Sequence, residues 1–428
     1  MKKDRVFLIG VYWGEESKEH YSESMEELHR LADTANTEVV RSFIQSLRKP
    51  NTATYIGKGK LSEIKNEAKN NNVKTLLFNN NLSPSQSRNI SDITGCNVVD
   101  RTELILDIFA LHATTRQSKL QVELAQLEYA YTKLKRKWKH LSRIQGGIGF
   151  RGPGETQIEV DRREIRKKTI ILKKKLESIE KTSITKRKKR SDKISIALVG
   201  YTNAGKSTLF NKLTHENRYT ADQLFATLDA KTRSLVLGNG ANLILTDTIG
   251  FIRNLPHKLV NSFHSTLLEV LEANLLLHVV DVSHPNIFEL MDSVYSVLEE
   301  IKVDNKNILV IFNKVDKVGG NHFKFLKKKL MIEYPDSVFI SAKTGEGLDE
   351  LYEKINLFTI KNLKTVTLTI PIEMQNLVSF IFDNAEVLED DFNPENNMRK
   401  ITIKISRQLL PNIKKQIEDF NLKKKLGI

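Results

Sequence analysis

Cysteine is almost absent from this 428-residue sequence, which contains only Cys96. A single cysteine excludes an internal disulfide and any metal site built from several cysteines. The ten histidines also lack the spacing of metal ligands. No apolar run approaches the roughly 18 residues that cross a bilayer, and the run from Val6 to Trp13 has no small-residue cleavage site. We therefore expect a soluble, cytoplasmic protein with no stable membrane insertion.

Acidic residues are scarce in one segment of the chain. Between Tyr131 and Lys193 there are 22 Lys and Arg residues but only 7 Asp and Glu residues, so this segment accounts for the whole formal net charge of +15. Charged helices that merely face solvent usually interleave both signs. An unbalanced basic segment favours a phosphate-rich partner, with nucleic acid as the first expectation and an anionic membrane as the second.

Length and periodicity predict four domains in an α/β chain, because 428 residues exceed one ordinary domain. Residues 1–112 alternate strand-like and helix-like pieces and form a small α/β domain. Residues 113–190 have helical spacing and form a long antiparallel helical hairpin with a linker. Residues 191–360 form a nucleotide domain with a parallel-rich sheet. Residues 361–428 read β-α-β-β-α, a small α+β domain to which the sequence assigns no role.

Two apolar seams with helical spacing define the hairpin. The first seam consists of Leu120, Leu124, Leu127, Tyr131, Leu134, Trp138 and Leu141, and the second of Ile158, Ile165, Leu172, Leu176 and Ile179. Between them, the stretch 145–156 contains five glycines and one proline, which keep it out of regular helix. This stretch is therefore predicted to form the tip of the hairpin.

Basic residues cover the outer faces predicted for both helices. The first helix carries Lys133, Lys135, Arg136, Lys137 and Lys139, and the second carries Arg162, Arg163, Arg166, Lys167 and Lys168. We interpret these faces and the tip as a contact with an RNA backbone, and the alternative is an ordinary solvated surface. The candidate RNA-binding residues are Lys135, Arg136, Arg143, Gly146, Gly147, Arg151, Gly152, Pro153, Gly154, Arg162, Arg163 and Arg166.

A glycine-rich phosphate-binding loop connects the predicted strand 194–199 to the predicted helix 207–213. Its pattern G-x-x-x-x-G-K-S is formed by Gly200, Tyr201, Thr202, Asn203, Ala204, Gly205, Lys206 and Ser207, followed by Thr208. The two glycines let backbone N–H groups approach phosphate oxygens, and the helix N-terminus adds its positive dipole. Lys206 is expected to bind the β- and γ-phosphates, and the Ser207 hydroxyl is an expected Mg²⁺ ligand. The alternative is a plain glycine-rich turn before a lysine.

Three further motifs follow predicted strands in the same domain. They are Asp247-Thr248-Ile249-Gly250, Asn313-Lys314-Val315-Asp316 and Ser341-Ala342-Lys343. Asp247 is expected to hold Mg²⁺ through water, and the Gly250 N–H to meet the γ-phosphate. A carboxylate at Asp316 accepts from two donors that guanine has and adenine lacks, so the predicted nucleotides are GTP and GDP. Together and in this order, the four motifs indicate a site for a guanine nucleoside triphosphate with Mg²⁺.

The segment Asp222–Asp229, D-Q-L-F-A-T-L-D, is the predicted nucleotide-sensing loop, which we call switch I. Within it Phe225, Ala226 and Thr227 are candidate nucleotide-binding residues, with Thr220 as the alternative to Thr227 as the sensor of the γ-phosphate. The candidate catalytic residues are Lys206, Thr227 and Gly250, and the candidate Mg²⁺ ligands are Ser207, Thr227 and Asp247. Phe251 stands where many GTPases carry a glutamine that orients water, so intrinsic hydrolysis is expected to be slow and activated by a partner.

With these motifs in place, the sequence resembles the HflX family of translational GTPases across nearly its whole length. The resemblance is carried by the phosphate loop, switch I and D-T-I-G-F, and by stretches outside the nucleotide domain. These are T-Y-I-G-K-G-K at 54–60, D-R-T-E-L-I-L-D-I-F-A at 100–110, K-L-Q-V-E-L-A-Q-L-E-Y at 119–129, G-G-I-G-F-R-G-P-G-E-T-Q-I-E at 146–159 and D-R-R at 161–163.

The resemblance implies binding to the large ribosomal subunit and its rRNA, and GTP-linked splitting or rescue of ribosomes. It also implies that the hairpin tip, 146–155, approaches rRNA, and that Asn203 occupies a position that helps to bind K⁺ in some related GTPases. The chain itself is expected to be a monomer. Two alternatives stay open: a regulatory switch that binds a protein or an anionic membrane, and an ATP-driven RNA-remodelling activity of the N-terminal domain.

Overall fold

The computed structural model describes residues 3–14, 18–144, 153–188, 194–215, 224–225, 227–237, 242–253, 264–303, 307–394, 396–406 and 409–426. The chain divides into two compact units. The first consists of Met1–Ile179 together with Thr220–Asp229 and Ile252–Thr266, and the second of Glu180–Tyr219, Ala230–Phe251 and Leu267–Ile428. Among the described helices, none combines the length and the apolar character that a membrane span requires.

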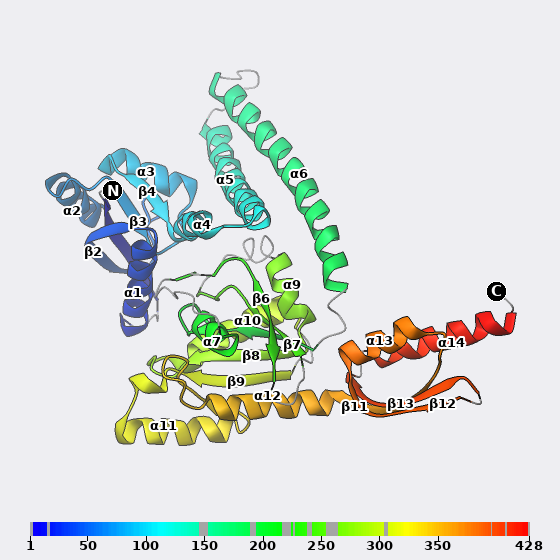
Figure 1. The fold of residues 1–428 in the computed structure, drawn as a ribbon. Helices are drawn as coiled ribbons and strands as arrows, with labels where there is room; N and C mark the ends of the chain where they lie inside the picture. The colour runs from blue at the N-terminus through cyan, green and yellow to red at the C-terminus, as the bar shows by residue number, and fades with distance from the viewer. Residues whose placement is uncertain are drawn as a thin grey trace. The chain divides into compact units, whose positions relative to one another are not determined.

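A four-stranded sheet with strand order β2-β1-β3-β4 forms the centre of the first unit (Figure 1). All its pairings are parallel, and its central strand β1 is buried over most of its length, as expected for a parallel sheet covered by helices. The elements are β1 (Asp4–Trp13), α1 (Lys18–Thr34), β2 (Thr37–Leu47), α2 (Lys58–Asn70), β3 (Thr75–Phe78), α3 (Pro84–Thr94), β4 (Asn97–Asp100) and α4 (Arg101–His112).

Helices α3 and α4 were not assigned from sequence periodicity, although both begin with a capping box. Ser83 caps α3 together with Gln86, and Asp100 caps α4 together with Glu103. In each box a side chain accepts from the backbone three residues later, and the later side chain accepts in return. These local signals were sufficient to predict both helices.

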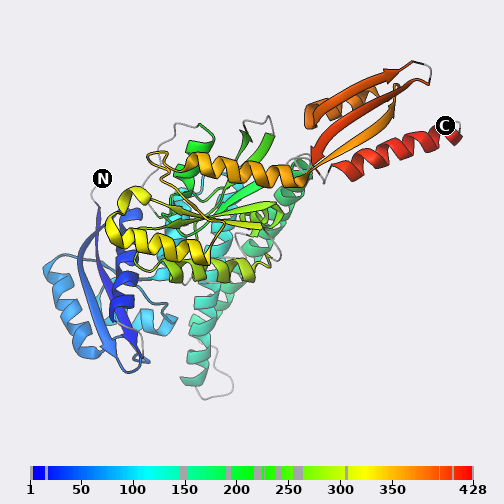
Figure 2. The same ribbon diagram turned by 90° about the horizontal axis from the view of Figure 1, so that it is seen from below.

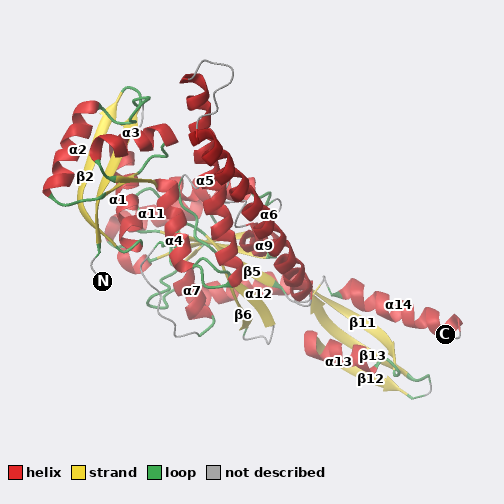
Figure 3. Ribbon diagram, turned by 90° about the horizontal axis from the view of Figure 1, so that it is seen from above, coloured by secondary structure: helices red, strands yellow, loops and turns green. Residues whose placement is uncertain are grey.

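The hairpin is formed by α5 (Arg116–Ile144) and α6 (Pro153–Lys188), which run side by side (Figures 1 and 3). The first half of α5 has two buried faces. Leu124 belongs to the predicted seam, whereas Ser118, Gln121 and Val122 are buried on a second face, where α5 packs against α3 and α4. Only the seam facing α6 was predicted, because small and polar residues on the second face give no apolar repeat.

A six-stranded sheet with order β10-β9-β8-β5-β7-β6 forms the centre of the second unit, and only β6 is antiparallel to its neighbour. Helices cover both faces (Figure 2): side chains of α7 and α12 join one hydrophobic cluster, and those of α10 and α11 another. The elements are β5 (Ser195–Val199), α7 (Lys206–Leu213), β6 (Lys231–Val236), β7 (Asn242–Asp247), α9 (His264–Glu272), β8 (Leu275–Asp281), α10 (Ile287–Glu300), β9 (Asn307–Asn313), η1 (Val315–Lys317), α11 (Gly320–Glu333), β10 (Val338–Phe339) and α12 (Leu348–Asn362).

The C-terminal elements form a three-stranded antiparallel sheet with order β11-β13-β12. Helices α13 and α14 pack on the same face of this sheet (Figure 1). The elements are β11 (Leu363–Pro371), α13 (Gln375–Asn384), β12 (Glu386–Asn393), β13 (Met398–Ser406) and α14 (Leu410–Leu426). The predicted fold class is confirmed: small α/β domain, helical hairpin, parallel-rich nucleotide domain and small α+β domain. The exact domain boundaries stay a prediction.

Candidate nucleotide-binding site

The phosphate-binding loop lies at the carboxyl end of β5 and leads directly into α7, which begins at Lys206. Gly200 has φ of +146°, and a Cβ atom there would lie 2.2 Å from the Val279 carbonyl oxygen. Gly205 has φ of +94°, and a Cβ atom there would lie 2.2 Å from the Asn313 side-chain nitrogen. Both positions therefore require glycine for conformation and for space.

Lys206 is buried within this loop. Its Nζ donates to the carbonyl oxygens of Gly200 (3.0 Å) and Tyr201 (2.8 Å). Burial lowers the pKa of Lys206 to about 8, with the charge of Asp247 acting to raise it and that of Lys314 to lower it. A phosphate group bound in the loop would supply the opposite charge that this buried ammonium lacks among its hydrogen-bond acceptors.

Ser207 lies in the first turn of α7 and Asp247 is the last residue of β7, and together they provide two oxygen ligands. The Ser207 hydroxyl donates to Asp247 Oδ2 over 2.7 Å, and Asp247 is fully buried. Hydroxyl and carboxylate oxygens are the hard donors that Mg²⁺ prefers, so these residues fit the ion that P-loop GTPases use. The described residues contain no group of three His, Cys, Asp or Glu side chains that could hold a metal alone.

The stretch after Asp247 is fixed to the phosphate loop by its backbone. The Phe251 N–H donates to the Gly200 carbonyl oxygen (3.1 Å), and the Thr202 N–H donates to the Phe251 carbonyl oxygen (2.7 Å). At Gly250, a Cβ atom would lie 2.9 Å from the Lys206 Nζ. The Phe251 side chain is 2% exposed. The ring is therefore a buried core side chain, a structural role that sequence reasoning had not assigned.

Asn313 connects the phosphate loop to the loop that follows β10. Its side-chain nitrogen donates to the Ala204 carbonyl oxygen (2.8 Å), and its side-chain oxygen accepts from the Ala342 N–H (2.9 Å). Both bonds are buried. The first residue of the N-K-V-D motif thus braces two loops.

Lys314 and Asp316 are also held by neighbouring side chains. The Lys314 Nζ donates to the Asn203 carbonyl oxygen (2.6 Å) and to Asp281 Oδ2 (2.7 Å). The Ser341 hydroxyl donates to Asp316 Oδ1 (2.6 Å), which orients the carboxylate predicted to bind guanine. Asp281 was missed by sequence reasoning. It ends strand β8 at the same sheet edge as the other motifs, and that position was a signal that could have identified it.

The remaining predicted nucleotide contacts divide between the units. Thr202, Thr248 and Ile249 lie in the second unit with the phosphate loop, as do Thr208 and Lys343. The Thr248 hydroxyl donates to the Leu198 carbonyl oxygen (2.5 Å), which fixes the loop after β7. Phe225 and Thr227 are buried and belong to the first unit. Ala226 and the alternative sensor Thr220 lie outside the described residues. The roles proposed for all these positions stay predictions.

One prediction about the basic faces of the hairpin is wrong. Lys133 does not lie on an open outer face, because its Nζ contacts the carboxylates of Asp100 (3.1 Å) and Glu103 (2.5 Å) at the base of α4. The Tyr129 hydroxyl also donates to Asp100 Oδ2 (2.6 Å). Burial together with the charge of Asp100 raises the pKa of Tyr129 well above its ordinary value. This network joins α5 to the sheet domain.

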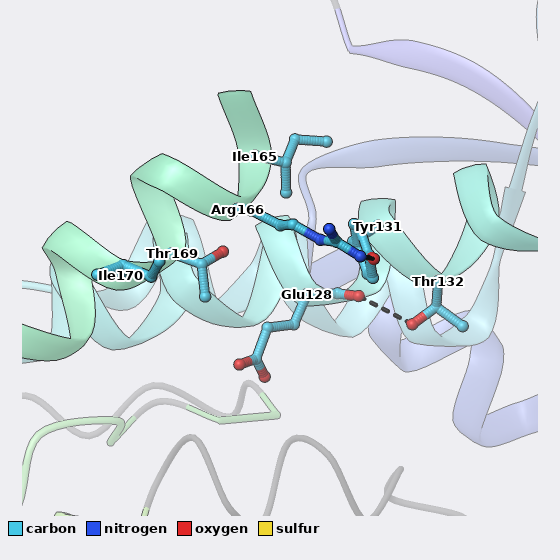
Figure 4. Close-up of a pocket in the computed structure, with 7 residues that line it drawn as sticks. All are labelled: Glu128, Tyr131, Thr132, Ile165, Arg166, Thr169 and Ile170. Atoms are coloured by element: carbon cyan, nitrogen blue, oxygen red, sulfur yellow. Dashed lines mark hydrogen bonds between the residues drawn. The ribbon is translucent and has the colours of Figure 1, made fainter. Parts of the chain in front are cut away.

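Arg166 reaches toward Tyr131 of α5 while it remains exposed (Figure 4), and the Arg162 guanidinium lies 5.6 Å from the centre of the same ring. The Arg166 guanidinium donates to the Tyr131 hydroxyl (2.7 and 3.1 Å) and lies 5.5 Å from the ring centre. Cation–π attraction favours this arrangement over full solvation. Beside it, a pocket of about 470 Å³ is lined by Glu128, Tyr131, Thr132, Ile165, Arg166, Thr169 and Ile170.

Arg163 is exposed on α6, as predicted. For the other candidate RNA-binding residues the side chains lie outside the described part of the structure. Lys135, Arg136 and Arg143 belong to α5, Pro153 and Gly154 begin α6, and Gly146, Gly147, Arg151 and Gly152 lie between the helices.

The parallel sheet, the phosphate loop at its carboxyl edge and the bracing Asn313 together define a P-loop GTPase, a class of GTP-hydrolysing enzymes. Four family profiles match the chain: "GTP-binding GTPase N-terminal" over residues 22–110, "GTP-binding GTPase Middle Region" over 112–190, "50S ribosome-binding GTPase" over 195–314 and "HflX C-terminal domain" over 327–425.

Two relatives named GTPase HflX agree with this assignment. GTPase HflX of Caldanaerobacter subterraneus is 40% identical over 98% of this chain and 94% of its own length, and GTPase HflX of Escherichia coli is 38% identical over 94% and 93%. A crystal structure of a GTP-binding protein from Sulfolobus solfataricus in complex with GDP is 31% identical, covers 83% of this chain and 98% of that one, and has a TM-score of 0.45. The chain belongs to the HflX family of GTPases.

Proposed function

We propose that this GTPase binds the large ribosomal subunit, and that it uses GTP binding and hydrolysis to split or rescue ribosomes. The observation that carries the proposal is the charge of the hairpin, which holds the whole excess of positive charge in a chain that is otherwise balanced. The match of residues 195–314 to a profile described as a 50S ribosome-binding GTPase supports the same partner. Ribosomal RNA is the phosphate-rich surface that such a hairpin would contact.

In the proposed mechanism, backbone N–H groups of the phosphate loop and the buried Lys206 ammonium bind the β- and γ-phosphates. Ser207 and Asp247 would hold Mg²⁺, which neutralises charge on the phosphates when it is bound. The Gly250 N–H and Thr227 would contact the γ-phosphate, and Asp316 would select guanine. Asn203 would help to hold K⁺ beside the phosphates.

The buried Phe251 supports slow hydrolysis by the isolated chain. Its side chain packs in the core and carries no polar group, so it does not orient the attacking water. The hydrolytic step then requires help from elsewhere, and we propose that the bound ribosomal subunit provides it. GTP turnover should therefore rise strongly when large subunits are present.

In this proposal, the exposed cations on α6 contact the phosphates of ribosomal RNA. Arg163, Lys167, Lys168, Lys174 and Lys175 are all exposed in the described part of this helix. Each contact between such a residue and a phosphate releases counterions, so binding should weaken steeply with salt. Arg162 and Arg166, which are engaged with Tyr131, would contribute less.

The test is GTP turnover by the purified chain in potassium buffer, with and without isolated large ribosomal subunits. We expect a large stimulation that is lost when the 146–155 tip is replaced by a short linker. Reversal of charge at Lys167 and Lys168 should also weaken subunit binding, by roughly tenfold per lost phosphate contact at low salt. A matched control reverses Lys414 and Lys415, which are equally exposed on α14 and should leave binding unchanged.

Absence of stimulation alongside intact GTP binding would contradict the proposal. It would favour the regulatory switch, whose partner is a protein or an anionic membrane. ATP turnover that survives Lys206→Ala would instead support a separate activity of the N-terminal domain.

A further inference from the structure

Asp229, the last residue of switch I, lies at the start of the hairpin helix α5. Its Oδ2 accepts from the Thr114 N–H (3.1 Å), the Thr114 hydroxyl (2.6 Å) and the Thr115 N–H (3.2 Å). Its Oδ1 accepts from the Thr115 hydroxyl (2.7 Å). One carboxylate thus receives four hydrogen bonds from two adjacent residues that are more than 110 positions away in the sequence.

These bonds are not needed to cap the helix locally. Thr115 already caps α5, because its hydroxyl accepts from the Ser118 N–H (3.1 Å). Asp229 adds a negative charge at the positive end of the helix dipole and pairs with N–H groups that precede the helix. Partial burial acts to raise the pKa of Asp229, but the hydrogen bonds from Thr114, Thr115 and Ser118 together lower it. The carboxylate is therefore ionised in this contact.

A second anchor holds switch I on the other side of Thr227. The Phe225 ring packs edge-on against Phe109 of α4, with 4.6 Å between ring centres and 82° between ring planes. Both rings are buried, and the Leu224 N–H donates to the Thr34 hydroxyl (3.3 Å). Thr227, the candidate γ-phosphate sensor, therefore lies between two points of attachment to the first unit.

We propose that Asp229 is a positioning residue that holds Thr227 for the γ-phosphate and, through the same carboxylate, connects the nucleotide state to the base of the hairpin. The proposal rests on the sensor role assigned to Thr227 under the proposed function. When the triphosphate orders Thr227, the chain from Thr227 to Asp229 is fixed at both ends, and the first turn of α5 is held more firmly. After hydrolysis Thr227 loses its contact with the γ-phosphate, and only the protein contacts at Phe225 and Asp229 remain.

Coupling of this kind is reciprocal, since a nucleotide that strengthens the Asp229 contact is bound more tightly when that contact is formed. A merely structural cap would stabilise α5 equally with either nucleotide. The two cases therefore differ in whether α5 responds to the nucleotide, and in whether kcat changes separately from KM.

The test is hydrogen exchange of the full chain with GDP and with a non-hydrolysable GTP analogue, read at the backbone amides of residues 114–118. In the wild type, exchange should be slower with the analogue by about 5-fold to 150-fold, the usual range of allosteric coupling. In Asp229→Asn, whose side-chain NH₂ faces N–H donors, exchange should be fast and nearly the same with both nucleotides. Asp229→Glu keeps the charge and should restore part of the difference.

Kinetics provide the second readout. Asp229→Asn should lower kcat for intrinsic GTP hydrolysis by roughly tenfold to a hundredfold, because Thr227 is misplaced, with little change in KM for GTP. The matched control is Asp92→Asn, which removes an exposed carboxylate on α3 whose partner Arg88 is also exposed. It should change neither quantity. Thr114→Val should also lower kcat. In the double variant the loss of kcat, expressed as free energy, should be smaller than the sum of the two single losses.

Exchange that is independent of nucleotide in the wild type would overturn the proposal. So would a nucleotide-dependent difference that survives in Asp229→Asn, or equal behaviour of the Asn and Glu variants. None of these measurements uses ribosomes, so failure of ribosomal stimulation and failure of this coupling are distinguishable.

Discussion

The phosphate loop and switch I both belong to the predicted GTP site, yet they are held in different ways. The loop is fixed by residues of its own unit, including Asn313, Phe251 and the Val279 backbone. Switch I, in its described residues, is fixed by the first unit at Phe109 and at the start of α5. The predicted phosphate site is thus braced within the second unit. The predicted sensing loop is instead held by contacts within the first unit.

The largest effect is expected from Gly200→Ala. The new methyl group would lie 2.2 Å from the backbone oxygen of Val279, at a φ that alanine rarely adopts. We expect the unfolding free energy of the second unit to fall by about 3 kcal/mol or more, with loss of GDP binding. Denaturant unfolding and GDP titration would measure both. Gly59→Ala, on α2 with open space around it, is the control and should be neutral or stabilising by about 0.5 kcal/mol.

Phe225→Ala should affect switch I and leave the phosphate loop unchanged. Removing this ring leaves a cavity against Phe109, so we expect the first unit to lose about 3 kcal/mol and switch I to exchange hydrogen faster. GDP affinity should stay within about twofold, because the phosphate loop is held independently. The control is Phe325→Ala, which truncates a ring that is 71% exposed on α11. A large loss of GDP affinity in Phe225→Ala would show that the regions are not independent.

A smaller effect should appear in mild acid. Burial lowers the pKa of His278 on β8 to about 3, with the charge of Lys206 acting in the same direction. The unfolded pKa is about 6.5, so the unfolded state binds the extra proton between these values and stability falls as pH falls. The slope should be up to about 1.4 kcal/mol per pH unit below pH 6.5. His278→Leu should lose this component, as measured by denaturant unfolding at pH 7 and pH 5. An unchanged slope in that variant would contradict the assignment.

The contrast between these regions also explains what the sequence could predict. The phosphate loop and the N-K-V-D motif are local patterns at strand ends, and the parallel sheet brings strand ends together by its topology. Their geometry was therefore predictable from residues and spacing. The capping boxes at Ser83 and Asp100 are equally local signals, each formed by residues three positions apart.

Contacts that depend on tertiary packing were not predictable in the same way. Lys133 looked like one cation in a basic run, and only the folded chain places two carboxylates beside it. Arg166 likewise has an aromatic partner on the facing helix. Asp229 belongs to a recognised motif, but its partners are more than 110 residues earlier. Sequence spacing carries no information about such pairs without an alignment.

The burial of Phe251 means that a single substitution at this position would not restore the glutamine that many GTPases use to orient water. A glutamine there would place its amide in the buried site that the Phe251 ring occupies, where burial of an unpaired amide costs about 1–3 kcal/mol. The backbone bridge to Gly200 and Thr202 would also hold the side chain in its present direction. A single substitution would therefore add the catalytic group without bringing it to the substrate. Faster intrinsic GTP hydrolysis would require changes both in the phosphate loop and in the core residues around position 251.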